Sequence, residues 1–93
     1  MTLRITRTAL RQIEAAIGYV EVRAPAGAEG IRTRIGVLLS ILHEHPFAGQ
    51  ATTRAGVRRL TLTPLPYVLF YRLAGDEIVV MRFQHASRRP FIG

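Results

Sequence analysis

Three apolar runs in the last third of the chain constrain its fold more than any other feature of the sequence. They are rich in β-branched and aromatic side chains, and they span residues 57–62, 67–73 and 78–85. Pro64 and Pro66 interrupt the first gap between them, and Gly75 and Asp76 interrupt the second. Such runs between turn residues indicate β-strands, and gaps this short make consecutive strands antiparallel neighbours. The sequence therefore predicts a three-stranded meander that the rest of the chain must cover or extend.

Two amphipathic helices are predicted upstream of the meander, after a short strand at residues 2–5. Apolar side chains recur there at spacings of three and four, the period of a helix with one buried face. They fall at Leu10, Ile13, Ile17 and Val20, and again at Ile31, Ile35, Leu38 and Leu42. Thr6 or Thr8 offers an N-cap for the first helix, and Pro46 ends the second. Residues 24–28 hold either a break or the start of the second helix, and the two helices are expected to form an antiparallel hairpin.

Residues 43–55 show no periodicity and are predicted to form a loop, with Phe47 anchored beneath the helices. The resulting order is β-α-α-β-β-β. This order indicates an α+β fold in which the helical hairpin packs on one face of a small twisted antiparallel sheet, leaving the other face partly open. A length of 93 residues suits a single domain over residues 1–93, and residues 91–93 are expected to form a disordered tail.

The charge of the chain is the most informative part of its composition. Thirteen basic residues, all of them arginine, stand against six acidic ones and give a net charge of +7. Although genomic base composition can favour arginine codons, arginine is also the side chain whose planar fork fits phosphate and carboxylate groups. A chain this basic predicts an anionic partner, either nucleic acid or an acidic protein.

Other parts of the composition exclude several classes of protein. The chain has no cysteine, which excludes disulfides, thiol nucleophiles and zinc–thiolate sites. Hydrophobic residues make up 48% of it, yet no apolar run approaches the ~18 residues of a membrane span, so no membrane association is expected. The N-terminus lacks the apolar core of a signal peptide, and a cytoplasmic location is expected. The apolar surplus is therefore expected to enter a core or a partner interface.

The order of the elements and several local sequences resemble the RelE/ParE superfamily of bacterial toxin–antitoxin toxins, and the ending is most similar to the ParE branch. The resemblance covers nearly the whole chain. It rests mainly on residues 66–72 (PYVLFYR) and on residues 85–90 (HASRRP), about one strand later. Further matches are Tyr19 in the first helix and residues 8–13 (TALRQI), 45–49 (HPFAG) and 56–60 (GVRRL).

The resemblance implies a small toxin that is neutralised by a tightly bound antitoxin, usually encoded beside it, in a hetero-oligomeric complex. ParE-type toxins are understood to inhibit DNA gyrase by trapping it with broken DNA, with growth inhibition and plasmid stabilization as the outcome. RelE-type toxins instead cut messenger RNA in the ribosomal A site. The shared fold does not choose between these activities. The ParE-like ending favours gyrase inhibition by protein–protein binding, and the alternative is a ribosome-dependent mRNA endonuclease.

The endonuclease alternative assigns four residues to catalysis. RNA cleavage without a metal needs a base for the 2′-hydroxyl, cations for the phosphate and an acid for the leaving oxygen. In this alternative Arg59, Arg72 and Arg82 hold the phosphate, and His85 acts as base or acid. Because arginine donates no proton near neutral pH and the chain has no lysine, His85 would carry the proton transfers alone. This shortage favours an interpretation without catalytic residues.

Two features that contain histidine also have structural interpretations. Counting by two from Val79, His85 shares a strand face with Met81 and Phe83, which predicts that it caps a core strand. Residues 43–45 (HEH) lack the spacing of a metal-binding motif, and the end of a helix before a proline explains them better. The sequence therefore predicts no metal site, and it indicates no cofactor.

The remaining candidates are interface residues. The ParE resemblance favours target binding, to acidic protein surface or DNA phosphates, by five residues: Arg58, Arg59, His85, Arg88 and Arg89. An antitoxin's acidic, disordered C-terminal segment is expected to lay a helix on the helical hairpin and an extended piece along the sheet. The residues predicted to contact this segment are Tyr19, Leu39 and Phe47.

Overall fold

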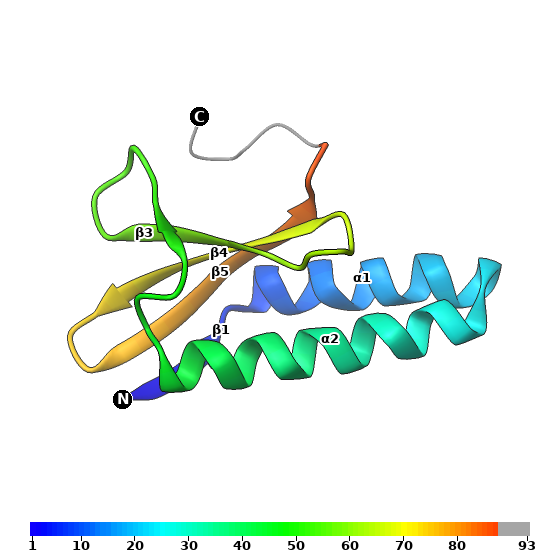
Figure 1. The fold of residues 1–93 in the computed structure, drawn as a ribbon, viewed down its shortest axis with the longest axis horizontal. Helices are drawn as coiled ribbons and strands as arrows, with labels where there is room; N and C mark the ends of the chain where they lie inside the picture. The colour runs from blue at the N-terminus through cyan, green and yellow to red at the C-terminus, as the bar shows by residue number, and fades with distance from the viewer. Residues whose placement is uncertain (88–93) are drawn as a thin grey trace.

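The computed structural model describes residues 1–87. Two long helices lie side by side against a five-stranded sheet (Figure 1). The elements are β1 (Thr2–Ile5), α1 (Arg7–Arg23), α2 (Pro25–Glu44), β2 (Gln50–Ala51), β3 (Val57–Thr61), β4 (Tyr67–Ala74) and β5 (Glu77–His85). The α+β fold class predicted from the sequence is confirmed, and the three apolar runs form β3, β4 and β5. The tail predicted at residues 91–93 lies outside the described residues.

The sheet is mixed, with its strands in the order β1-β5-β4-β3-β2. The meander from β3 to β5 is antiparallel, as predicted. At the other edge β1 pairs parallel with β5, with Leu3 opposite Ile78. The expectation of a wholly antiparallel sheet was wrong here, because the long connection through both helices and the meander lets β5 run in the same direction as β1.

The segment predicted to be a loop at residues 43–55 contains further structure. The second helix extends to Glu44, and Gln50 and Ala51 form β2, which pairs with Arg59 and Arg58 of β3. Two residues are too few to show the alternation of a strand, so the sequence pattern did not reveal β2. The short strand leaves the rest of β3 at the edge of the sheet.

The helix boundaries follow the capping residues in the sequence. Thr6 is the N-cap of α1, and its hydroxyl accepts a hydrogen bond from the Ala9 N–H at 3.1 Å. Only Ala24 separates the helices, because Pro25 occupies the first turn of α2, where a missing N–H costs nothing. Of the two alternatives for residues 24–28, the start of the second helix is therefore confirmed.

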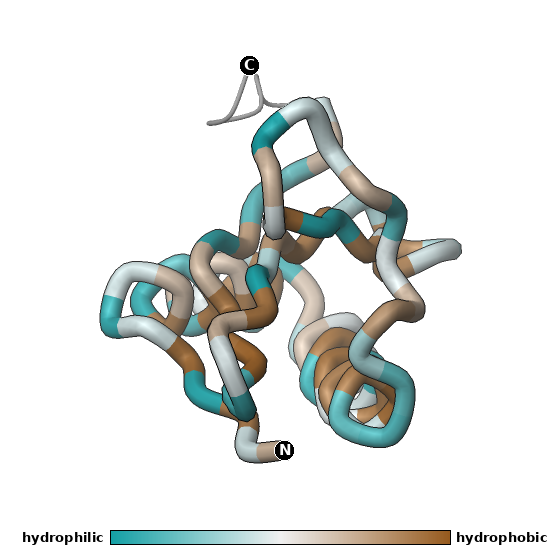
Figure 2. Tube along the Cα trace, turned by 90° about the vertical axis from the view of Figure 1, so that its left-hand side faces the viewer, coloured by the Kyte–Doolittle hydropathy of each residue, from teal (hydrophilic) through white to brown (hydrophobic). Residues whose placement is uncertain are grey.

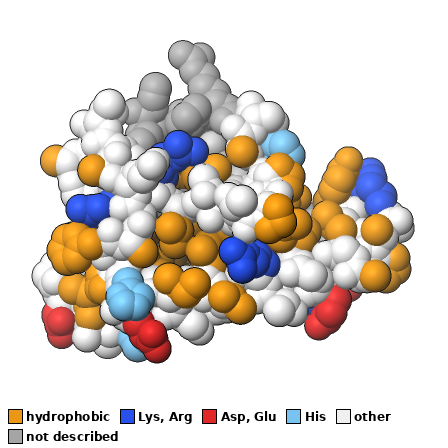
Figure 3. Space-filling view, in the orientation of Figure 1, with side chains coloured by type: hydrophobic (Ala, Val, Ile, Leu, Met, Phe, Trp, Pro, Cys, Tyr) orange, Lys and Arg blue, Asp and Glu red, His pale blue; other side chains and the backbone are white. Residues whose placement is uncertain are grey.

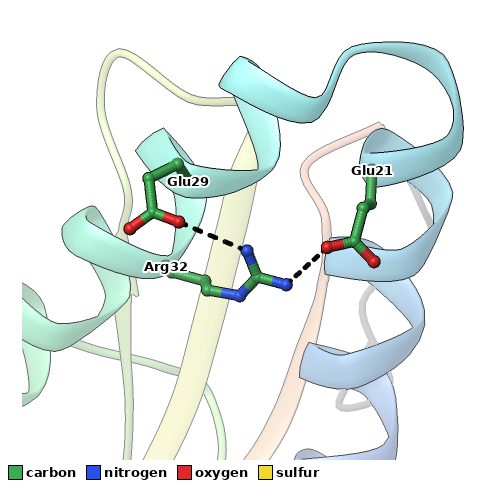
Figure 4. Close-up of polar contacts among 3 residues, drawn as sticks. All are labelled: Glu21, Glu29 and Arg32. Carbon is green, nitrogen blue, oxygen red and sulfur yellow. Dashed lines mark hydrogen bonds and ion pairs between the residues drawn. The ribbon is translucent and has the colours of Figure 1, made fainter.

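An ion-pair network joins the two helices near this junction (Figure 4). Arg32 of α2 donates to Glu21 of α1 at 2.8 Å and to Glu29 at 3.4 Å. The hydrogen bond from Arg32 to Glu21 raises the pKa of the arginine. All three side chains are substantially exposed, so the network contributes little to the stability of the fold.

The core lies between the helices and the sheet, where hydrophobic residues recur along both (Figure 2). The predicted helix stripes supply Ile13 and all four residues of the second stripe, and the sheet supplies Leu69, Tyr71, Val80 and Phe83. Leu10, the first residue of the predicted stripe, is 46% exposed instead. No helix within residues 1–87 has the length and apolar character needed to cross a membrane.

A β-bulge interrupts the pairing of β4 and β5. Phe70 pairs with Arg82 whereas Tyr71 pairs with Val80, so Met81 is an extra residue in β5. Before the bulge Val80 faces the helices, and after it Phe83 does. The bulge therefore shifts the alternation of β5 by one residue.

Candidate functional site

The face of the sheet that points away from the helices carries a group of arginines. Paired residues of neighbouring strands share a face. Arg59, Phe70 and Arg82 form one such row across β3, β4 and β5. A second row contains Val57 and Arg72 and continues through Val79 to Arg4 of β1. Because Val57 and Phe70 form a small apolar cluster apart from the main core, these rows lie on the open face.

A pocket of about 470 Å³ lies on this face. Its apolar lining comes from Val57, Val79 and Met81. Four arginines surround this lining: Arg4, Arg54, Arg72 and Arg82. Thr6, Thr8 and Ala55 complete the pocket, which we call the basic pocket. The bulge helps to build it, because Met81 and Arg82 are consecutive residues that both reach the open face.

The turn between β2 and β3 brings Arg54 to the pocket. The Thr52 hydroxyl accepts a hydrogen bond from the Arg54 N–H at 3.3 Å and donates one to the Val57 carbonyl at 2.8 Å. Gly56 has a φ of 78°, a left-handed conformation that suits glycine. Arg54 was not among the candidates from the sequence, because a residue in an irregular turn has no predictable face.

The charged side chains that line the basic pocket are all positive. Arg4 pairs with Glu77 at 3.3 Å, and Arg82 donates to the Met81 carbonyl at 3.0 Å. Within residues 1–87, the Arg54 and Arg72 guanidinium groups have no hydrogen-bond or ion-pair partner. The described lining contains arginine and threonine as its polar residues, so the pocket suits an anion but offers no group that exchanges protons near neutral pH.

His85 lies on the other face of the sheet from these arginines. It pairs with Tyr67, and the two rings meet edge to face at 5.5 Å. Tyr67 in turn stacks on Phe83 of the core at 5.1 Å. The predicted common face of His85 and Phe83 is confirmed, but the inclusion of Met81 was wrong because of the bulge. The structure therefore brings Arg72 and Arg82 together and separates His85 from them.

The His85 imidazole is exposed and makes its polar contacts locally. The Ser87 N–H donates to Nδ1 at 3.1 Å, so Nδ1 carries a lone pair and the neutral ring holds its proton on Nε2. The Ser87 hydroxyl also lies 2.7 Å from Nδ1. With Gln12, Tyr19 and Tyr67, His85 lines a second pocket between α1 and the end of β5.

Arg58 points to the opposite face from Arg59 and holds the segment after α2. Its guanidinium donates to the Gly49 carbonyl at 2.7 Å and lies 4.9 Å from the centre of the Phe47 ring. The Tyr71 hydroxyl accepts from the Gly49 N–H at 2.9 Å and donates to the Pro46 carbonyl at 2.8 Å. Burial raises the pKa of this phenol. These bonds fix residues 46–49 on the sheet.

Phe47 is 67% exposed, so its predicted place beneath the helices was wrong. The sequence also missed Val37 and Ile41, which lie one turn apart on α2 and are 43% and 40% exposed. We call these two residues the α2 stripe. Their i, i+4 spacing outside the buried stripe was the available signal. Figure 3, drawn in the orientation of Figure 1, shows hydrophobic side chains gathered on the side of the molecule where α2 lies.

The predicted antitoxin contacts do not form one surface. Tyr19 is 59% exposed and lies on α1, where the Arg23 guanidinium stacks on its ring at 3.6 Å from the centre. Leu39 is half-buried and packs against the main core. Phe47 lies beyond the far end of α2. Arg88 and Arg89, predicted to bind the target, lie outside the described residues.

Residues 43–45 end α2, as the sequence indicated. The His43 imidazole Nε2 lies 2.9 Å from the Met1 carbonyl, and His45 is the C-cap, whose N–H donates to the Ile41 carbonyl. Within the described part of the chain, no three His, Asp or Glu side chains are grouped to hold a metal ion.

Comparison with known proteins gives consistent matches. Residues 3–90 match the family described as the ParE toxin of the type II toxin–antitoxin system parDE. A Sinorhizobium fredii protein, Y4kP, is 30% identical over 94% of this chain and 90% of its own length. Toxin RelE2 of Caulobacter vibrioides is 31% identical over 89% of this chain and 92% of its own. A solved structure, the chromosomal ParDE system from P. aeruginosa, matches with a TM-score of 0.83 and 28% identity over 94% of this chain and 97% of the matched chain.

Proposed function

We propose, from the premise that the chain belongs to the ParE toxin family of type II toxin–antitoxin systems, that it inhibits DNA gyrase by protein–protein binding in the cytoplasm. A ParD-like antitoxin would neutralise it. The toxin role and the existence of an antitoxin partner follow from the family and from the similarity to a solved ParDE system. The gyrase target is the new element of the proposal.

One observation carries the choice of binding over catalysis. His85 and the open-face arginines lie on opposite faces of the sheet. A phosphate held by Arg72 and Arg82 would have no described histidine, lysine or carboxylate in the pocket to move a proton. The geometry therefore supports a toxin that acts by occupying a surface of its target.

The α2 stripe supports the antitoxin part of the proposal. An amphipathic helix of the antitoxin can place apolar side chains on Val37 and Ile41. Arg34 precedes the stripe by one turn, and Arg58 flanks the exposed Phe47 ring. Cations beside apolar residues suit the acidic, amphipathic segment expected of such an antitoxin.

The proposal is tested by adding the purified toxin to gyrase and relaxed plasmid. Supercoiling should stop and linear plasmid should accumulate after protein digestion, and prior addition of the antitoxin should prevent both. In cells, a pulse of toxin without antitoxin should stop DNA synthesis before protein synthesis. Unimpaired supercoiling at a toxin excess over gyrase would overturn the proposal.

A ribosome-dependent mRNA endonuclease is the second candidate, and the similarity to a protein named Toxin RelE2 favours it. In this candidate His85 would provide acid or base chemistry and Arg59, Arg72 and Arg82 would hold the phosphate, so the substrate would have to reach both faces of the sheet. It predicts that protein synthesis stops first and that transcripts are cut at codons. His85→Ala would then abolish toxicity and leave antitoxin binding intact.

A further inference from the structure

We propose that the basic pocket binds the sugar–phosphate backbone of a DNA strand. The toxin would then contact DNA as well as protein in the gyrase complex, an inference that rests on the proposed function for the identity of the nucleic acid. Charge, hydrogen-bonding capacity and the shape of the pocket support it separately.

Charge is distributed unevenly over the described chain. Four of the six acidic residues of the sequence lie on the helices: Glu14, Glu21, Glu29 and Glu44. The open face and its rim carry one carboxylate, Glu77, against five arginines: Arg4, Arg54, Arg59, Arg72 and Arg82. Glu77 is already paired with Arg4. Among residues 1–87, most of the uncompensated positive charge therefore lies on the face that carries the pocket.

The pocket also has unused hydrogen-bond donors. Arg54 and Arg72 have no side-chain partner within residues 1–87, and each guanidinium presents a planar fork that fits two phosphate oxygens. The first turn of α1 adds to this field, because Thr6 and Thr8 line the pocket and that turn contains no acidic residue. The positive end of the helix dipole therefore faces the pocket without a neutralising side chain.

The size and lining of the pocket favour a sugar–phosphate unit over a bare anion. Its 470 Å³ is many times the ~30 Å³ that one water molecule occupies in the liquid, so an inorganic ion would leave it mostly filled with water. The half-buried Met81 offers apolar surface for the carbon face of a deoxyribose, above a floor formed by the almost fully buried Val57 and Val79. The arginines around them can then reach the phosphates on either side.

Such a site reads no sequence. Contacts to phosphate and sugar position a nucleic acid but carry no base information. Binding should therefore be independent of sequence and should weaken steeply with salt. The matching partner is a flexible strand, because a recessed pocket admits a single backbone more readily than the convex surface of a duplex.

The test measures binding of the full-length toxin to a short fluorescein-labelled single-stranded oligodeoxynucleotide by fluorescence anisotropy across a salt series. The double variant Arg54→Gln/Arg72→Gln should bind at least about tenfold more weakly, and its slope of log K against log salt should fall by about 1.4, since each single-strand phosphate contact contributes about 0.7. The matched control Arg11→Gln/Arg34→Gln removes the same charge from the exposed helix surface and should change Kd less than about threefold.

A second variant separates charge from folding. Arg54→Lys/Arg72→Lys keeps both charges and should bind within about threefold of the wild type, because lysine still neutralises a phosphate. If it binds as weakly as the glutamine variant, or if the helix-surface control loses as much, the pocket does not hold the strand. Absent binding by the wild type, or tighter binding to RNA of the same sequence, also overturns the proposal.

The outcome for the pocket is distinguishable from the outcome for gyrase. The binding measurement contains no gyrase, so a DNA-binding toxin that leaves supercoiling intact would overturn the proposed function and keep the pocket. A glutamine double variant that loses DNA binding yet inhibits gyrase as strongly as the wild type would keep the target and overturn the DNA contact.

Discussion

Arg58 and Arg59 are neighbours in β3, yet they lie on opposite faces of the sheet. Arg59 pairs with Phe70 on the open face, while Arg58 bonds to the Gly49 carbonyl and lies over Phe47. From the sequence, both were predicted to bind the target. The structure gives them separate roles, one on the open face and one in holding the segment after α2.

This difference predicts unequal effects on stability. Arg58→Ala removes a charged hydrogen bond and the cover of Phe47, and it should lower the free energy of unfolding by about 1–2 kcal/mol. Arg59→Ala removes a side chain that makes no hydrogen bond or ion pair within residues 1–87, and it should change the free energy of unfolding by at most about 0.5 kcal/mol. Urea unfolding of both variants checks this, and equal losses would show that Arg58 does not hold residues 46–49.

Tyr71→Phe should destabilise the protein in a manner that depends on pH. At neutral pH, the loss of the hydroxyl leaves the Gly49 N–H without its acceptor and should cost about 1–3 kcal/mol. Because the pKa of Tyr71 in the folded state is raised above 10.0, the unfolded chain loses the phenol proton first, and stability falls as the pH rises past that value.

The difference between wild type and Tyr71→Phe should therefore shrink as the pH rises above about 10. Denaturant unfolding of both proteins at neutral and alkaline pH measures it, and the phenylalanine variant removes the contribution of all other titrating groups from the comparison. A difference that stays constant up to strongly alkaline pH would contradict the role of the buried phenol.

Two glycine-to-alanine substitutions should have opposite signs. A Cβ at Gly49 would lie 2.7 Å from the Arg59 carbonyl and from the Tyr71 ring, so Gly49→Ala should destabilise by about 2 kcal/mol or more. A Cβ at Gly18 meets nothing within 4 Å in α1, so Gly18→Ala should stabilise by about 0.5–1 kcal/mol. Thermal unfolding compares them, and a destabilising Gly18→Ala would show that α1 is not a free helix surface there.

Antitoxin affinity should depend on the α2 stripe. Ile41→Asp places a carboxylate where apolar contact with an acidic segment is proposed, and it should weaken binding at least about tenfold, as loss of a central contact does. Val22→Asp, on α1 at 84% exposure, is the matched control and should leave the affinity nearly unchanged. Calorimetric titration with the antitoxin segment measures both, and a larger loss from Val22→Asp would move the interface to α1.

His85→Asn should preserve most of the toxicity. Asparagine keeps a polar side chain at the end of β5, and a binding mechanism requires no proton transfer there. Growth after induction in cells without antitoxin provides the measurement. Loss of toxicity with intact gyrase binding would revive the endonuclease interpretation.

The sequence predicted the elements whose patterns are local. Alternation and short gaps identified β3 to β5, and helical spacing together with Thr6 identified both helices. It did not predict the parallel pairing of β1 or the two-residue β2, because strand direction and very short pairings depend on tertiary contacts. The sequence therefore predicted the fold except for the pairing of the two edge strands of the sheet.

The candidate site was less accessible for a related reason. Arg72 and Arg82 were recognised as possible phosphate ligands, but the extra residue in β5 places Met81 on the open face and not on the face predicted for it with Phe83 and His85. The spacing of three between the core residues Val80 and Phe83 was the available sign of that bulge. Arg54 and Ile41 were missed because the periodicity of the sequence does not predict which side chains are exposed in turns and on the flanks of helices.

Because of the bulge at Met81, β5 contains one residue more than its pairing with β4 requires. In a regular strand, the loss of one residue turns every later side chain to the other face. Here, deletion of Met81 would make β5 equal in count to its partner and leave Arg82, Phe83 and His85 on their present faces. An inner strand of the sheet, paired on both sides, thus contains one position at which a residue can be deleted without turning the later side chains to the other face.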